Sequence, residues 1–109
     1  MRVLFDQGTP DPLRHALTAH VVSTAYEMGW SSLSNGDLLD AAEAQFDAFV
    51  TTDHNLQHQQ NLTSRRLAIL VLPFANWPRL QKHLPTILPT IVSAIENLTP
   101  GAFVEPSLP

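Results

Sequence analysis

Three aspartates occupy positions that a parallel sheet would bring close together, at the C-terminal ends of its strands. Asp6 follows the apolar run Val3–Phe5, and Asp53 follows the β-rich run Ala48–Thr52. Asp37 falls in the first turn of a predicted helix, three residues after a serine that can cap it. If the two strands are neighbours, their terminal carboxylates lie about one strand spacing apart, ~5 Å. Two like charges at that separation favour a bound cation.

The expected cation is a hard divalent ion. Mg²⁺ or Mn²⁺ is satisfied by a few carboxylates together with water and substrate phosphates. Asp37 is the best third acid, and Asp40 lies about one turn further along the same helix. His54 and His58 are also four residues apart, but they have no evident third ligand. We therefore expect both histidines to face solvent.

The elements that must position these acids alternate along the chain. Strand-like runs are apolar or β-branched, whereas helical segments carry apolar residues at steps of three and four. Leu84, Leu88, Ile91, Ile95 and Leu98 give the strongest helical pattern, which Pro89 should kink or restart. The predicted order is strand 2–5, helix 10–19, strand 20–23, helix 34–46, strand 48–52, a loop with a short helix at 56–61, strand 67–72, helices from 77 to 98, and an edge strand at 102–105.

This alternation predicts an α/β fold with a mostly parallel central sheet. Right-handed crossovers place helices on both faces of such a sheet, giving three α/β/α layers. The length of 109 residues suits a single domain. We expect residues 1–98 to form its body, and residues 99–109 to add an edge strand and a proline-rich tail.

Composition limits the classes of function. The chain has no cysteine, a net charge of −4 and only six lysines and arginines, which counts against a general nucleic-acid binder but not against a nuclease. No apolar run approaches the ~20 residues that a membrane-spanning helix needs. No secretory signal is read at the N-terminus. The expectation is a soluble cytoplasmic protein without a membrane partner.

Three segments in a fixed order resemble a known family. Leu4–Pro10, Asn35–Leu39 and Val50–Leu56 look like the corresponding segments of the small bacterial PIN-like proteins, which include VapC-type toxin ribonucleases. The likeness extends over nearly the whole chain and includes Pro100–Val104 as a family-like final strand. It implies a three-layer PIN-like fold and metal-assisted hydrolysis of RNA phosphodiesters.

The resemblance also implies roles for individual residues. Asp6, Asp37 and Asp53 would be the metal-binding and catalytic acids, with Asn55 as a fourth polar ligand. The remaining roles are orientation of the carboxylates by Thr51 and Thr52, and binding of a substrate phosphate by Arg65 or Arg66. The implied cofactor is Mg²⁺ or Mn²⁺. The implied partners are an RNA substrate, an antitoxin protein, and a second copy in a homodimer.

The chain departs from the family pattern at two places. PIN nucleases commonly have four acids, whereas Gln7 and Asn55 stand here where further acids are expected. The acidic charge balance is a third difference from efficient RNA binders. These departures keep a second hypothesis open, that the chain is a non-catalytic PIN-like module that binds a protein partner.

Overall fold

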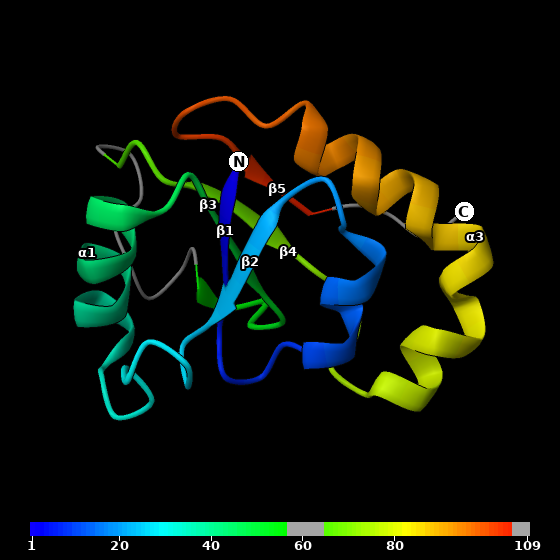
Figure 1. Cartoon of the computed structure of the whole chain (residues 1–109), viewed down its shortest axis with the longest axis horizontal. Helices are drawn as coiled ribbons and strands as arrows, with labels where there is room; N and C mark the ends of the chain where they lie inside the picture. Colours follow the sequence, from blue (N-terminus) through cyan, green and yellow to red (C-terminus); the bar gives the residue numbers. More distant parts are fainter. Residues whose placement is uncertain (57–64, 106–109) are drawn as a thin grey trace.

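The computed structural model describes residues 1–56 and 65–105 and shows a mixed α/β fold (Figure 1). Five parallel strands form one sheet in the order β2-β1-β3-β4-β5. The elements in chain order are β1 (Arg2–Phe5), η1 (Asp11–Ala16), β2 (Val21–Thr24), α1 (Asn35–Gln45), β3 (Ala48–Thr51), β4 (Ala68–Val71), α3 (Trp77–Glu96) and β5 (Phe103–Val104). The predicted strand order along the chain and the parallel sheet are therefore confirmed.

The three inner strands are almost completely buried. β3 and β4 are buried along their full length, and β1 is buried from Val3 onward. Their side chains alternate between the two faces, as the pleat requires. Val3 and Phe5 contribute to one apolar cluster, whereas Leu4 contributes to the other. Continuous apolar runs form these strands because both faces are covered.

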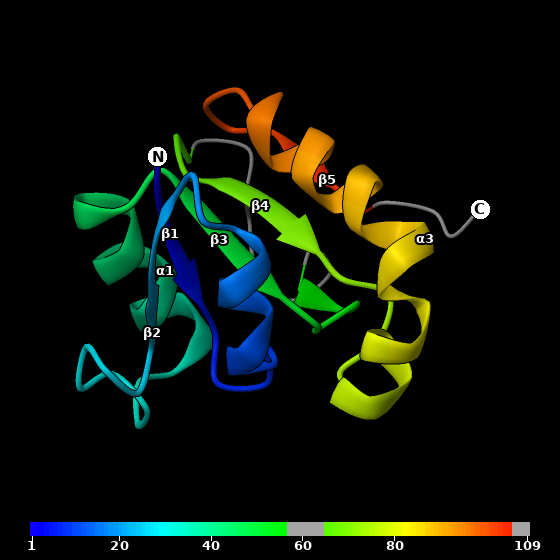
Figure 2. The ribbon, with the colours of Figure 1, turned by 45° about the vertical axis from the view of Figure 1, so that its right-hand side comes forward.

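Helix α1 covers one face of the sheet (Figures 1 and 2). Ser34 caps it, since its hydroxyl accepts a hydrogen bond from the backbone N–H of Asp37 at 3.3 Å. Leu39, Ala42 and Phe46 follow helical spacing in the sequence, which predicts that they face the sheet. All three are buried in the cluster on this face, so the prediction is confirmed. Trp30 adds an edge-on contact with the Phe46 ring, with centroids 6.1 Å apart.

The opposite face is covered by η1 and α3, which share the other cluster with the sheet (Figure 2). The predicted helix over residues 10–19 is wrong in type and length, because the chain forms a 3₁₀ helix over Asp11–Ala16. Thr9 does not cap it. Its hydroxyl instead lies within hydrogen-bond distance of Asp6 and of the backbone oxygen of Val50.

Helix α3 runs for 20 residues without a break, although Pro85 and Pro89 lie inside it. Pro89 was expected to kink or restart the helix, and Figures 1 and 2 show that α3 bends and continues. Each proline removes one backbone hydrogen bond and its ring crowds the preceding turn, which favours a bend. Ile87, Ile91 and Ile95 are buried against the sheet.

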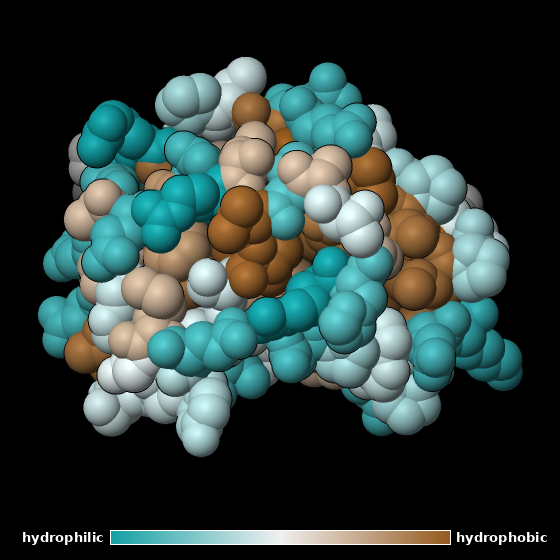
Figure 3. Space-filling view, viewed as in Figure 1, coloured by the Kyte–Doolittle hydropathy of each residue, from teal (hydrophilic) through white to brown (hydrophobic). Residues whose placement is uncertain are grey.

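Strand β5 pairs with β4 through Ile69 with Phe103 and forms one edge of the sheet, as predicted. Strand β2 forms the other edge, where Val21 is 64% exposed. Figure 3 shows apolar surface over this edge strand. Across the described ranges, no helix has the length and apolar character needed to cross a membrane.

Candidate functional site

Asp6 lies directly after β1, at the side of the sheet formed by the C-terminal ends of the parallel strands. We call this the carboxyl edge, and the opposite one the amino edge. One carboxylate oxygen of Asp6, Oδ2, accepts a hydrogen bond from the Thr51 hydroxyl at 2.5 Å. The other, Oδ1, accepts from the Thr9 hydroxyl at 2.5 Å. Since Thr9 and Thr51 are both buried, the carboxylate is held in one orientation.

Asp53 follows β3, the strand that pairs with β1. Its backbone N–H donates to the Thr51 hydroxyl oxygen at 3.0 Å. Its side-chain oxygen Oδ1 accepts from the backbone N–H of Asn55 at 2.9 Å, which closes an Asx turn. Thr51 therefore bonds both to the carboxylate of Asp6 and to the backbone of Asp53.

Thr52 and Gly8 narrow the space beside Asp6. A Cβ built on Gly8 would lie 3.1 Å from the Thr52 hydroxyl oxygen and 3.9 Å from Oδ1 of Asp6. A glycine at this position therefore lets the turn after β1 pass close to β3. No hydrogen bond between Thr52 and either acid is found in residues 1–56 and 65–105, so Thr51 alone makes the predicted orienting contact.

Asp37 lies in the first turn of α1 and is exposed, where its backbone N–H is capped by Ser34. Figure 1 shows that α1 begins at the carboxyl edge. Asp40, the alternative acid, instead forms an ion pair with Arg65 at 2.9 Å. Within the part of the chain that the structure describes, no three His, Cys, Asp or Glu residues form a group that could hold a metal ion.

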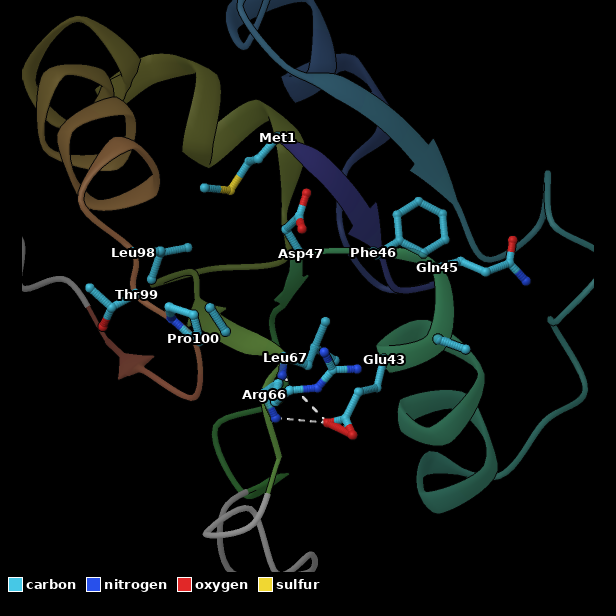
Figure 4. Close-up of a pocket in the computed structure, with 12 residues that line it drawn as sticks. Met1, Glu43, Gln45, Phe46, Asp47, Arg66, Leu67, Leu98, Thr99 and Pro100 are labelled. Atoms are coloured by element: carbon cyan, nitrogen blue, oxygen red, sulfur yellow. Dashed lines mark hydrogen bonds between the residues drawn. The ribbon is translucent and has the colours of Figure 1, made fainter.

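The predicted phosphate-binding arginines precede β4 and so lie at the amino edge. Arg66 lines a pocket of about 610 Å³ there together with Met1 and Asp47 (Figure 4). Its backbone N–H and that of Leu67 donate to the Glu43 carboxylate. The structure therefore does not bring Arg65 and Arg66 together with Asp6, which lies at the far end of the strands.

Sequence reasoning missed the residues that share a pocket with Asp6. This pocket, of about 400 Å³, is lined by Asp6, Gln7, Thr9, Asp11, Thr24, Tyr26 and Glu27, and we call it the Asp6 pocket. Asp11 and Glu27 do not follow apolar strands, so the pattern that identified Asp6 could not find them. Tyr26 was also missed, although it is 78% exposed at the pocket wall.

Arg14 connects the two missed acids. Its guanidinium lies 2.6 Å from Asp11 and 2.5 Å from Glu27. The hydrogen bond from Arg14, together with one from the backbone N–H of Thr24, holds the pKa of the Glu27 carboxyl below its ordinary value. The same bond to Glu27 raises the pKa of Arg14. One positive charge therefore faces two of the three acids of the Asp6 pocket.

His54 is exposed, and its Nδ1 lies 2.8 Å from the Glu105 carboxylate. This contact joins the loop after β3 to the end of β5. The expectation that His54 faces solvent is confirmed, whereas His58 falls outside the described residues.

Comparisons with protein-family models, with curated proteins and with solved structures find no match to this chain.

Proposed function

We propose that the chain is a metal-dependent ribonuclease with a three-layer PIN-like fold, and that Asp6 and Asp53 hold the metal. The observation that supports this most is the Thr51 hydroxyl, which bonds to Asp6 and to the backbone of Asp53 at the ends of neighbouring strands. Ligands of parallel α/β sheets bind at the carboxyl edge, where these two acids lie.

The donor set fits Mg²⁺ or Mn²⁺. Each carboxylate oxygen can accept more than one bond, so the threonine contacts of Asp6 leave further acceptor capacity. Hydrogen bonds that fix a carboxylate are also typical of metal ligands. Asp37, on the helix that begins at the same edge, and Asn55 are the proposed additional ligands. Mg²⁺ or Mn²⁺ bound here would lower the pKa of a water molecule and offset charge on phosphoryl oxygens.

The remaining parts of the proposal rest on the resemblance of Leu4–Pro10, Asn35–Leu39 and Val50–Leu56 to the PIN-like proteins. They are an RNA substrate, a role as the toxin of a toxin–antitoxin pair, an antitoxin partner and a homodimer. Activity in the cytoplasm is proposed from the sequence, in which no apolar run approaches the ~20 residues of a membrane-spanning helix. The Asp6 pocket is lined by three acids, which would repel the phosphate of an RNA substrate. A bound divalent cation would offset this negative charge, which agrees with a metal-dependent reaction.

A metal titration tests the proposal directly. Isothermal titration with Mn²⁺ should detect one site in the wild-type chain and none in Asp6→Asn or Asp53→Asn. Labelled single-stranded RNA should be cleaved only with Mg²⁺ or Mn²⁺, and Asp6→Asn should slow cleavage by roughly a hundredfold or more. Glu96→Gln, which changes an exposed acid near the end of α3, is the matched control and should leave both readouts unchanged.

Two observations favour a second candidate, a non-catalytic PIN-like module that binds a protein partner. Both oxygens of Asp6 already accept threonine hydroxyl bonds, and the described residues contain no group of three His, Cys, Asp or Glu side chains that could hold a metal ion. If the folded wild-type chain takes up no Mn²⁺, or if cleavage survives both EDTA and Asp6→Asn, the nuclease proposal fails. Absence of both Mn²⁺ uptake and cleavage supports the binding module.

A further inference from the structure

The charges of this chain are segregated along its sequence. None of the ten Asp and Glu residues falls between residues 54 and 95, whereas four of the six Lys and Arg residues do. This stretch contributes β4 and nearly all of α3. A strong asymmetry of charge within one small domain is typical of proteins that bind a polyanion.

The cations differ in what they contact. Arg14 pairs with Asp11 and Glu27, and Arg65 pairs with Asp40. Arg2 and Arg66 belong to the amino edge, where the guanidinium of Arg2 lies 4.9 Å from the centroid of the Phe46 ring.

Arg79 and Lys82 are the remaining two cations. Both are exposed, and across residues 1–56 and 65–105 no ion pair joins either of them to a carboxylate.

Arg79 and Lys82 lie in the first two turns of α3, which begins a few residues after β4 ends. Figures 1 and 2 show that this start lies at the carboxyl edge, the edge at which β1 delivers Asp6. The first turn of α3 contains no acid, so the partial positive charge of the helix N-terminus adds to the two side chains. Figure 3 shows hydrophilic surface where α3 begins.

An aromatic ring fixes one of these cations. The guanidinium of Arg79 lies 4.1 Å from the centroid of the Phe74 ring, and the His83 ring lies 5.9 Å from the same centroid. A guanidinium held over a ring loses less conformational freedom on binding, and its N–H groups remain available for an anion. Phe74, Arg79, Lys82 and His83 together form what we call the α3 basic surface.

We infer that the α3 basic surface binds the phosphates of single-stranded RNA, and that it holds the strand whose scissile bond lies at Asp6. This inference rests on the proposed function. It concerns the phosphates of the RNA strand that Asp6 and Asp53 do not contact. Arg79 and Lys82 take the role that the sequence suggested for Arg65 and Arg66. Two cations three residues apart on a helix are neighbours, with Cβ atoms ~5–6 Å apart, so they can serve consecutive groups of one strand.

The experiment measures binding without chemistry. In an Asp6→Asn background with EDTA, fluorescence anisotropy of a labelled 20-nucleotide single-stranded RNA is followed from low to moderate salt. The double variant Arg79→Ala/Lys82→Ala should bind roughly tenfold more weakly or worse, and the slope of log K against log salt should shrink by about 1.4, since each phosphate contact on a single strand contributes about 0.7. The double variant Arg2→Ala/Arg66→Ala removes the same charge from the amino edge and should change affinity by less than about twofold.

Three results would overturn the inference: equal losses in the two double variants, an unchanged salt slope in Arg79→Ala/Lys82→Ala, or heparin binding that falls while RNA binding does not. These failures differ from failure of the nuclease proposal. A chain that binds RNA through Arg79 and Lys82 but never cleaves it refutes the proposed function and supports the surface. Metal-dependent cleavage that is indifferent to Arg79 and Lys82 refutes the surface alone.

Discussion

The hydroxyl of Thr51 donates a hydrogen bond to the carboxylate of Asp6 at 2.5 Å, across the pair of strands β3 and β1. The same oxygen accepts from the backbone N–H of Asp53 at 3.0 Å. Thr51 is 1% exposed, so water cannot replace either bond. One hydroxyl therefore fixes both the orientation of Asp6 and the path of the chain into Asp53.

Removing this hydroxyl should destabilise the fold. Thr51→Val keeps the volume and the β-branch but leaves the N–H of Asp53 and one oxygen of Asp6 without their buried partner. We expect the free energy of unfolding in urea to fall by about 1–3 kcal/mol. Thr51→Ser is the matched control, since it keeps the hydroxyl, and it should lose less. A larger loss in Thr51→Ser than in Thr51→Val would show that the methyl group matters more than the bond.

Local pattern predicted the strands that carry Asp6 and Asp53. Apolar runs covered on both faces, followed by a carboxylate, are visible in the order of the residues alone. The acids were therefore placed on two strands that the structure shows to be neighbours. The helix that begins after Ser34 was equally visible, because its capping serine and its buried positions depend on residues three and four apart.

The contacts that complete the site join residues distant in sequence, and no local pattern contains them. Thr51 reaches Asp6 across 45 positions, and Arg14 reaches Glu27 across 13. A phosphate-binding role for Arg65 or Arg66 was implied only by the resemblance to the PIN-like proteins. Their place before β4 puts them at the amino edge, so the direction of the strand decides against that role. For the same reason the cations after β4 reach the carboxyl edge.

The ion pair between Arg14 and Glu27 should make stability depend on pH. Because the pKa of Glu27 is depressed in the folded chain, its contribution is present above the ordinary value of 4.5 and is lost as the pH falls through the folded value. Glu27 is 48% exposed, so we expect only about 0.2–1 kcal/mol. Urea unfolding should show Glu27→Gln less stable than wild type at pH 7, with a difference that shrinks as the pH falls below 4.5. For the control Glu96→Gln, the difference from wild type should not follow this pH course.

Gly101 and Gly29 allow the cost of backbone strain to be compared with the cost of a steric clash when a side chain is added. Both have positive φ, +78° and +76°, a conformation that costs most residues about 1–2 kcal/mol. A Cβ on Gly101 would also lie 2.9 Å from the backbone oxygen of Arg65, whereas nothing lies within 4 Å at Gly29. Gly101→Ala should therefore lower the urea midpoint more than Gly29→Ala. Equal losses would mean that the segment between α3 and β5 shifts without cost.

Pro89 should limit the stability of α3. An alanine there restores an N–H that can donate to the carbonyl of Pro85 and removes the ring that crowds the preceding turn. A proline inside a helix costs ~3 kcal/mol, so its replacement should stabilise the folded chain. The alanine variant has a more flexible unfolded chain, which offsets about 1 kcal/mol of this stabilisation. Pro89 is exposed and Ile87 and Ile91 on either side of it are buried, so the core contacts can persist while the hydrogen bond forms.

For Pro89→Ala we expect a gain in the free energy of unfolding of about 1–2 kcal/mol, measured in urea with an unchanged slope. Thr90→Ala, at the adjacent exposed position, controls for helix propensity alone and should give about 0.5 kcal/mol. A lower midpoint for Pro89→Ala would contradict this expectation. It would mean that the bend in α3 is what seats Ile87 and Ile91 on the sheet, and that the proline stabilises the fold by enforcing it.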